Sequence, residues 1–342
     1  MKRAVTMRAV ANRARVSPAT VSRFINNKTI SADAEQRVLG AIKDLQYSPN
    51  RLARSLRMKK TMTLAMVIPD ITNPFFPEVV KGVEDTARAA GFTLMLFNAG
   101  DDEDRQWECL QAVHEQRCDG VLLIIAPKGR HHAERRQQLK HFNLPIVYVD
   151  RSPDFPADIV MVDNLRSAQE AVRHLVRLGH TRIAAITVDF DVSVHRDRMA
   201  GYRLVMNDAG LPVRPEYEVQ AAPTVADGYS AAARLLALPD RPSAIFVTNN
   251  RVAVGVIAAI ESHGLRCPAD ISVLAYDSHE WQDVFHPRLT TVTQPTYLMG
   301  TRAAELLIGR MTDRTGGAPQ QVLLQSALTV RESCDVYQKG PR

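Results

Sequence analysis

The sequence is poor in cysteine and lacks long apolar runs, and both absences exclude classes of protein. Its 342 residues include only Cys109, Cys118, Cys267 and Cys334, which have neither the close pairing of a zinc site nor the density of a disulfide framework. No apolar run reaches the ~20 residues that span a membrane, and no apolar segment typical of a secretory signal follows the basic N-terminus. We therefore expect a cytoplasmic protein with reduced thiols.

Motifs of enzymes are also missing. The sequence contains no H-E-x-x-H, no G-x-x-x-x-G-K-[ST] and no G-x-S-x-G pattern. His131 and His132 lie in a strongly charged stretch and are expected to be solvated, while His180 follows a helix-ending glycine, where a cation suits the helix dipole. We therefore expect no catalytic residues, no metal and no cofactor.

The charge of the chain is distributed unevenly. Of the 43 Lys and Arg residues and the 37 Asp and Glu residues, the first 60 positions hold 14 and 3, a net charge of +11, while the remaining 29 and 34 give residues 61–342 a net charge of −5. A strongly basic segment joined to a mildly acidic body indicates that the segment alone meets a polyanion. A basic solvated tail would lack the apolar periodicity that this segment has.

Two short helices are predicted in the basic segment. Thr6 is a candidate N-cap for the first, and the second begins with Ser17, another good N-cap, and Pro18 at the first helical position. The apolar stripes are Met7, Val10, Ala11 and Ala14 in the first helix and Val21, Phe24 and Ile25 in the second. Taken alone, this pattern fits a helix-turn-helix and an ordinary helical hairpin equally well.

A third helix is predicted over residues 32–46, with Val38, Leu39, Ile42 and Leu45 on one face, and a short helical stretch over 51–57 follows a proline stop. The whole run resembles the DNA-binding headpiece of the lactose-repressor (LacI/GalR) family. The matching residues are Val16-Ser17, Thr20-Val21-Ser22-Arg23, Asn26, Arg37-Val38, Ala41-Ile42, Leu45, Tyr47, Pro49-Asn50, Ala53-Arg54 and Ser55-Leu56. This dense match favours the helix-turn-helix.

By this resemblance the second helix enters the major groove of double-stranded operator DNA. Arg23 is expected to carry most of the hydrogen bonding to bases, because Pro18 and Ala19 offer only apolar contact. Leu56 is expected to be a minor-groove wedge in a helix that forms only on DNA, with a flexible linker as the alternative. The expected DNA-binding residues are Thr6, Ser17, Pro18, Ala19, Thr20, Ser22, Arg23, Asn26, Asn50, Ala53 and Leu56.

The rest of the chain alternates between apolar strands and helices. Strands are expected at 63–68, 92–97, 121–125, 145–149, 182–188, 243–248, 272–275 and 290–293, and helices at 75–90, 102–116, 131–142, 167–178, 195–209, 228–237, 252–263 and 297–311. Strands without polar alternation indicate parallel sheets covered on both faces. Because the alternation restarts after residue 163, we predict an α/β fold with two lobes and a cleft at the carboxyl ends of the strands.

This body resembles the ligand-binding core of the same family, which is similar to periplasmic sugar-binding proteins. The matching phrases are residues 71–76, 118–121, 178–184, 198–202, 242–246, 275–277 and 289–292. The resemblance implies a small all-α head at 1–48, a hinge helix and linker at 49–61, a two-lobe effector-binding and dimerisation core at 62–333 and a tail at 334–342. Lobe 1 is expected at about 62–162 and 290–320, and lobe 2 at about 163–289 and 321–333.

The family's pocket positions imply a site for a small-molecule effector, a sugar or sugar derivative. Aromatic side chains would supply an apolar wall, although Phe76 fits a core position equally well, and charged and amide groups would orient the ligand. The expected effector-binding residues are Phe75, Phe76, Asp150, Arg198, Asn249, Asp277 and Gln294, the last at the hinge between the lobes.

The sequence also departs from the family pattern. Arg15 stands where the helix-turn usually carries glycine, and left-handed geometry there would cost about 1 kcal/mol. Ala34-Glu35 replaces the usual Thr-Arg, which would weaken a phosphate contact. Asn250 replaces a common Asp, and residues 275–278 read Ala-Tyr-Asp-Ser in place of a Gly-aromatic-Asp-Asp run. These departures leave the identity of the effector open more than the fold.

Three functions can be compared on this basis. The first is a homodimeric or larger transcription regulator, a repressor, whose operator affinity a small molecule controls. The second is a cytoplasmic ligand-binding protein that does not read DNA, and the third is a Rossmann-like enzyme acting on a sugar or nucleotide. The head's charge of +11 favours the first over the second, and the missing catalytic motifs argue against the third.

Overall fold

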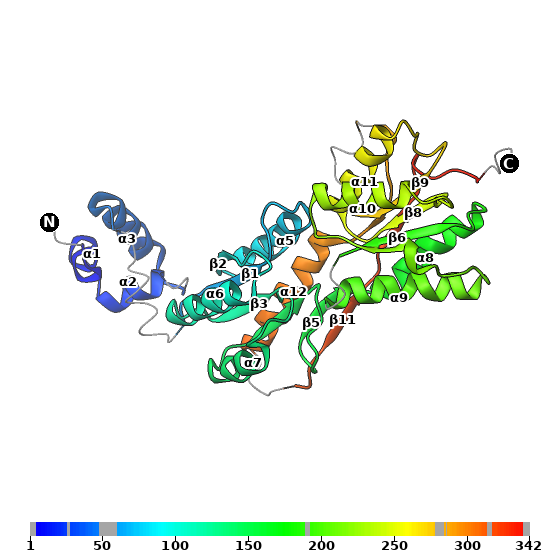
Figure 1. Cartoon of the computed structure of the whole chain (residues 1–342). Coiled ribbons are helices and arrows are strands. Elements are labelled where there is room, and N and C mark those ends of the chain that lie inside the picture. The colour runs from blue at the N-terminus through cyan, green and yellow to red at the C-terminus, as the bar shows by residue number, and fades with distance from the viewer. Residues whose placement is uncertain are drawn as a thin grey trace. The chain divides into compact units, whose positions relative to one another are not determined.

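The computed structural model describes residues 5–25, 28–47, 60–188, 192–277, 284, 286–312 and 317–337. The chain divides into two compact units, residues 1–62 and 63–342, which Figure 1 colours from blue to red along the chain. Four of the expected DNA-binding residues, Asn26, Asn50, Ala53 and Leu56, lie outside the described residues. Among the described residues, none of the helices is long and apolar enough to cross a membrane.

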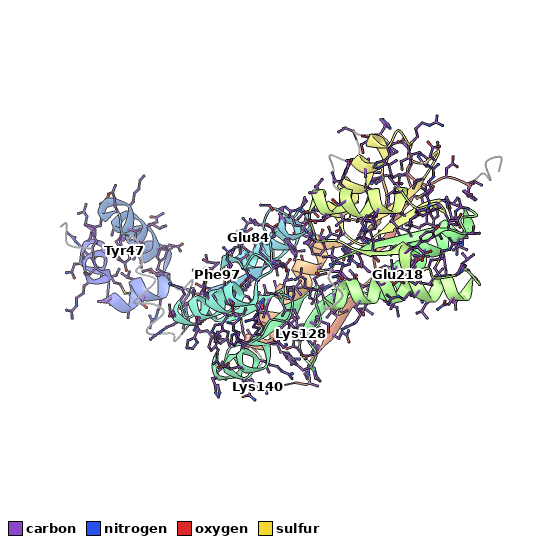
Figure 2. All side chains as sticks on the ribbon, in the orientation of Figure 1. Tyr47, Glu84, Phe97, Lys128, Lys140 and Glu218 are labelled. Atoms are coloured by element: carbon purple, nitrogen blue, oxygen red, sulfur yellow. The ribbon has the colours of Figure 1, made fainter. Side chains whose placement is uncertain are left out.

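Within residues 5–25 and 28–47, the first unit contains the helices α1 (Met7–Ala14), α2 (Pro18–Ile25) and α3 (Ala32–Leu45). Thr6 caps α1 by accepting a hydrogen bond from the amide of Ala9, as expected. The buried core is Val10, Ala11, Ala14, Val21, Val38 and Ala41, with Tyr47, labelled in Figure 2, packed against it. One expectation is wrong: Leu39 is half exposed, and Ala34 lies on the buried face of α3 instead.

The turn between α1 and α2 has the left-handed geometry that the glycine of the family pattern suggests. Arg15 adopts φ 53° and ψ 45°, and its amide and that of Val16 close the end of α1 by donating to carbonyls of the last turn. A residue with a Cβ carries about 1–2 kcal/mol of backbone strain there. Arg15 therefore carries backbone strain that a glycine would avoid, and its side chain is exposed.

The second unit contains two six-stranded sheets. The first sheet is formed by β1 (Thr63–Ile68), β2 (Thr93–Asn98), β3 (Gly120–Leu123), β4 (Ile146–Val149), β5 (Ile159–Val162) and β11 (Gln321–Leu324), in the order β11-β5-β4-β3-β1-β2. The helices of this lobe are α5 (Phe75–Ala89), α6 (Glu103–Glu115), α7 (His132–His141) and α12 (Thr296–Thr312). All pairs in this sheet are parallel.

The second sheet repeats the topology of the first. It is formed by β6 (Ile183–Thr187), β7 (Glu218–Gln220), β8 (Ala244–Val247), β9 (Ser272–Tyr276), β10 (Thr290–Thr293) and β12 (Ala327–Thr329), in the order β12-β10-β9-β8-β6-β7. Its helices are α8 (Asn164–Arg177), α9 (Ser193–Asp208), α10 (Val225–Leu236) and α11 (Asn250–Ser262), and a 3-10 turn spans Pro215–Tyr217. The predicted parallel sheets are confirmed except for the antiparallel pair β10–β12. The short strands β5, β7, β11 and β12 were not predicted.

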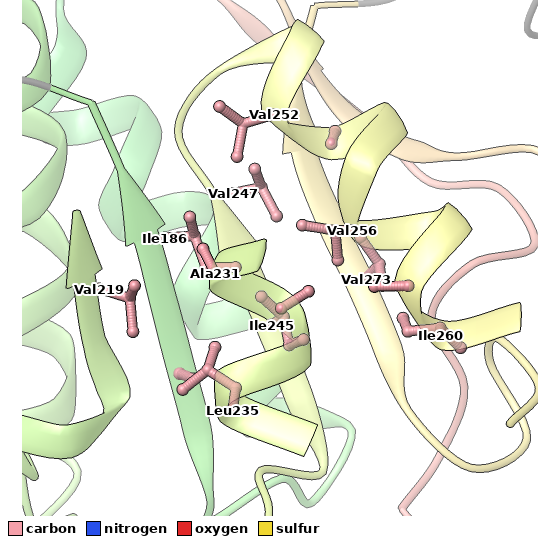
Figure 3. Close-up of a cluster of buried hydrophobic side chains, with 14 of the residues drawn as sticks. Ile186, Val219, Ala231, Leu235, Ile245, Val247, Val252, Val256, Ile260 and Val273 are labelled. Atoms are coloured by element: carbon pink, nitrogen blue, oxygen red, sulfur yellow. The ribbon is translucent and has the colours of Figure 1, made fainter. Parts of the chain in front are cut away.

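Both faces of the second sheet are buried against helices. Figure 3 shows side chains of β6, β8 and β9, among them Ile186, Ile245 and Val273, packed against α10 and α11. A second cluster covers the other face of that sheet and includes Tyr202 of α9 and Phe246 of β8. The pattern of uninterrupted apolar residues therefore follows from burial on two sides.

The lobes exchange segments near the end of the chain. β10, at residues 290–293, belongs to the sheet of the second lobe, and β11, at residues 321–324, belongs to the sheet of the first. Both assignments are the reverse of the expected lobe boundaries. Residues 334–337 are packed against the second lobe, since the amide of Tyr337 donates to the carbonyl of Leu178 and the amide of Asp335 donates to Ser272 Oγ. The chain thus passes between the lobes three times, after β5, β10 and β11.

Candidate functional site

The exposed face of α2 carries the residues expected to meet DNA. Ser17 accepts from the amide of Thr20 at 3.1 Å, and the two hydroxyls lie 2.9 Å apart, so both are fixed at the helix start. Pro18, Ala19 and Arg23 are exposed, while Thr20 and Ser22 are half-buried. The structure therefore brings these six residues together at one end and one face of a short helix.

Arg23 is the cation of this surface. Within residues 5–25 and 28–47, the ion pairs join Arg13 to Asp44 and Arg37 to Asp33. Arg23 therefore has no carboxylate partner in the described part of the head. An exposed guanidinium beside small side chains can approach a base edge without first breaking an ion pair.

In the larger unit, the expected effector residues gather where strands end. Asp150, Asn249, Asp277 and Gln294 directly follow or lie two residues beyond β4, β8, β9 and β10. Phe75 and Phe76 open α5, which follows β1, and Arg198 lies on α9, which follows β6. Parallel strands place all of these positions at the carboxyl edges of the two sheets, where doubly wound folds bind ligands.

Asp150 and Asp277 occupy equivalent positions in the two lobes. Each follows the third strand from the edge of its sheet, β4 and β9 respectively. Each also has a positive φ, 64° for Asp150 and 66° for Asp277, and each is buried. Left-handed residues at such positions carry backbone strain that tends to gather at binding sites.

The polar atoms of this cleft are incompletely satisfied. Burial, opposed by the charges of Arg151 and Arg198, raises the pKa of Asp150 to about 6. Among the described residues, Asp150 Oδ1 and Gln294 Oε1 are buried and have no hydrogen-bond partner, although Gln294 Nε2 donates to Asp277 Oδ1 at 2.7 Å. Such atoms are costly unless a ligand or water satisfies them.

Arg198 is buried and held from three sides. Its Nε donates to Asn164 Oδ1 at 2.9 Å, its Nη1 donates to the carbonyl of Thr248 at 2.7 Å, and its guanidinium lies 3.6 Å from the ring centroid of Tyr276. Burial and the charges of Arg198 and Arg151 lower the pKa of His195 well below its usual value. The cleft therefore contains fixed cations, buried carboxylates and a neutral histidine.

Three of the expected effector-binding residues also have structural roles, which limit how much of each side chain can contact an effector. Asn249 caps α11 by accepting from the amides of Arg251 and Val252, which leaves its amide nitrogen for a ligand. Phe75 and Phe76 are both buried in the core of the first lobe, with their rings edge to face at 5.1 Å. Their packing shows that Phe76 has the core position that the sequence left open.

Several polar contacts join the two lobes across the cleft. Asn250 Nδ2 donates to Asn73 Oδ1 at 2.9 Å, and Arg251 donates to Asp70 and to the hydroxyl of Thr72. On the other side, the amide of Ser152 donates to Ser193 Oγ at 2.9 Å. The Asn250 that departs from the family pattern is therefore part of the contact that closes the cleft.

Sequence reasoning missed Asn164 and Arg151. Asn164 is buried and orients Arg198, and it was missed because β5, which ends just before it, was not recognised. The apolar run at residues 159–162 was the available signal. Arg151 is buried beside Asp150, where it pairs with Asp101 and donates to the carbonyl of Ile125.

Among the described residues, no group of three or more His, Cys, Asp or Glu could hold a metal ion.

Comparison with known sequences gives two family matches. Residues 6–50 match the family described as bacterial regulatory proteins, lacI family, and residues 172–334 match the periplasmic binding protein-like domain. The chain is 38% identical over 312 residues to the ribose operon repressor of Escherichia coli (strain K12), covering 91% of this chain and 94% of that protein. It is 36% identical over 318 residues to the HTH-type transcriptional repressor PurR of Aliivibrio fischeri (strain ATCC 700601 / ES114), covering 90% and 92%.

Comparison of structures agrees with these matches. The chain resembles the crystal structure of the Lac repressor dimer bound to operator and the anti-inducer ONPF, with a TM-score of 0.86 and 25% sequence identity. The similarity covers 97% of this chain and 100% of that one. The likeness therefore extends over both units rather than over the core alone.

Proposed function

The chain belongs to the LacI family and is a DNA-binding transcriptional regulator controlled by a small molecule, and we propose that its effector is a pentose-sized sugar bound in the cleft between the lobes. In this proposal, the exposed face of α2 contacts operator DNA, and the residues at the strand ends of the core bind the effector. It gives the cleft a binding role and assigns no reaction to it.

The observation that carries this proposal is the set of buried charges at the strand ends. Asp150 and Asp277 offer acceptors from opposite lobes, and Arg198 and Arg151 offer donors beside them. A sugar presents hydroxyls around its whole edge, and each hydroxyl both donates and accepts. Donors and acceptors that converge from two sides fit such a ligand better than one that is polar on a single edge.

Two relatives support different effectors, and the residues of the cleft favour the sugar. The relatives named above are a ribose operon repressor and a transcriptional repressor named PurR. A purine would need long apolar walls above and below its ring, whereas Phe75 and Phe76 are both packed into the lobe core. Phe75 and Phe76 are 6% and 4% exposed, so they leave little apolar surface to the cleft, and a ligand held mainly by polar contacts fits better.

Calorimetry with D-ribose, D-glucose and hypoxanthine tests the effector. We expect saturable binding of D-ribose and much weaker binding of the other two. Asp277→Ala should weaken D-ribose binding by at least tenfold, because a buried Asp can accept two ligand donors. The matched change Asp208→Ala, at an exposed position at the end of α9, should leave the affinity unchanged.

Gel shifts against an operator library complete the test. Asp277→Ala should still bind DNA in the absence of D-ribose, while its response to D-ribose is lost. Tight binding of hypoxanthine without binding of D-ribose would show that the effector is a purine rather than a sugar. Unchanged D-ribose affinity in Asp277→Ala would contradict the site itself.

We further propose that the regulator works as a homodimer in the cytoplasm, where operator DNA is found. Exposed apolar side chains on the core support self-association, among them Leu96 of β2, Val225 and Tyr229 of α10, and Tyr297 and Leu298 of α12. The Lac repressor that the chain resembles is a dimer on its operator. Dimeric mass in sedimentation at micromolar concentration is the expected result.

A further inference from the structure

The first lobe contains a recess that lies apart from the strand-end residues described above. It opens between α6 and α7, on which Lys140 is labelled in Figure 2, and its cavity volume is about 60 Å³. The apolar lining comes from Trp107, Leu110, Leu123, Leu139, Tyr148 and Phe155.

The aromatic side chains of the recess are held in place. Tyr148 and Phe155 meet edge to face at 5.8 Å, and Trp107 stacks on Phe142 at 5.4 Å. The guanidinium of Arg136 lies 4.0 Å from the ring centroid of Phe155. Burial raises the pKa of Tyr148 to about 12, so that its hydroxyl stays neutral. The recess is therefore a preformed slot lined with flat surfaces rather than a gap between mobile side chains.

One edge of the recess carries polar atoms without hydrogen-bond partners. Gln106 is 8% exposed, and its Nε2 has no partner among the described residues. The same holds for Glu103 Oε2, one turn earlier on α6, and for Arg135 Nη1 of α7, which lie 3.6 Å apart as an ion pair without hydrogen-bond geometry. His132 Nδ1 lies 3.3 Å from Glu103 Oε1. A buried donor and a buried acceptor thus stand side by side on one helix face.

We propose that this recess is a second ligand site, which binds a small, flat, uncharged aromatic amide or lactam. The ring would lie between the aromatic and leucine side chains. The ligand carbonyl would accept from Gln106 Nε2, and the ligand N–H would donate to Glu103 Oε2. This pairing satisfies both buried atoms at once, which a ligand with only one kind of polar group cannot do.

The charges around the recess argue for a neutral ligand. The carboxylate of Glu103 forms part of the polar edge and would repel a ligand carboxylate, while the Arg135 guanidinium that faces Glu103 would disfavour a cation. A purely apolar ligand would leave Gln106 Nε2 buried without a hydrogen bond and Glu103 Oε2 with only its ion pair to Arg135, at a cost in affinity. The amide edge is the chemistry that these side chains complement.

Fluorescence of the full chain tests the proposal with benzamide as the probe. The chain has two tryptophans, Trp107 and Trp281, so a Trp281→Phe background reports on the recess alone. We expect a saturable change in emission with a dissociation constant of roughly 0.1–1 mM, as is reasonable for so small a ligand. Benzoate and toluene should each bind about tenfold more weakly.

Two matched substitutions on α6 locate the binding. Gln106→Leu removes the buried donor and should weaken benzamide about tenfold, without lowering the melting temperature. Gln111→Leu makes the same change at an exposed position of the same helix and should leave the affinity unchanged. Equal affinity in the two variants, toluene binding as tightly as benzamide, or no saturable signal at all would show that the recess holds water only, and would overturn the proposal.

Discussion

Replacing Asp150 by Asn should stabilise the ligand-free protein, and by an amount that depends on pH. The carboxyl is buried, its Oδ1 has no hydrogen-bond partner among the described residues, and its pKa rises from 3.8 to about 6 in the folded chain. At about 1.36 kcal/mol for each pH unit of difference, the buried charge costs about 3 kcal/mol once it is ionised. Asn tolerates the positive φ as well as Asp does, so the backbone should not change.

The sign follows from proton linkage. The unfolded chain releases this proton near pH 3.8, whereas the folded chain keeps it to about pH 6. Between those two values the folded state binds more protons, so its stability falls as pH rises, and it is constant above pH 6. The difference in free energy of unfolding between Asp150→Asn and the parent should therefore grow from near zero at pH 4 to about 3 kcal/mol at pH 7.5, with the variant the more stable.

Urea denaturation of the full chain at pH 4.0, 5.0, 6.0 and 7.5 measures this difference. Asp208→Asn, on the exposed end of α9, serves as the control and should show no such trend. In the parent, sugar affinity should rise with pH through about 6, because ligand hydroxyls donate to the ionised form of Asp150. A stability difference that is independent of pH, or one in favour of the parent at pH 7.5, would refute the reasoning.

Four further predictions concern the head, the hinge and the closure of the lobes. Arg23→Ala should cost about 1–3 kcal/mol at the specific operator and relax one base position in a selection from an operator library. A fragment of residues 61–342 should remain folded, dimeric and ligand-responsive in sedimentation and calorimetry. Asn250→Asp removes the donor that reaches Asn73 Oδ1 and should weaken effector binding about tenfold in calorimetry. Leu56→Ala should abolish operator bending in circular-permutation gels and lower specific affinity while keeping non-specific binding; normal bending would favour a flexible linker.

Much of the fold was predictable from the sequence because its elements depend on local chemistry. The caps at Thr6 and Ser17 and the apolar strand at residues 63–68 were identified correctly, and helix α12 was placed within one residue at each end. β5, β7, β11 and β12 were missed because they are only three or four residues long, and the period of so few residues cannot distinguish a strand from a loop. Leu39 was misplaced because two helix faces were similarly apolar, and only the packing of the three helices decides between them.

The candidate site was less predictable than the fold. Family positions supplied Asp150, Arg198 and Asp277. In the structure all three are buried, the two aspartates directly after β4 and β9 and Arg198 on α9. The partners of these residues come from distant parts of the chain: Asn164 orients Arg198 from 34 residues away, and Gln294 meets Asp277 from 17 residues away. No local pattern encodes such contacts, so they required the tertiary structure.

The three crossings between the lobes constrain how the core can move. They leave from β5 and β11, which are neighbours at one edge of the first sheet, and from β10, which is the neighbour of β12 at the matching edge of the second. Because the tethers are confined to one edge, we expect the lobes to rotate about that edge more easily than they slide past each other. β2 stands five strand spacings from this axis, roughly 24 Å, so a rotation of about 10° would displace it by about 4 Å. A small rotation of the lobes around a ligand near this edge would therefore produce a larger displacement at the far edge of the first sheet.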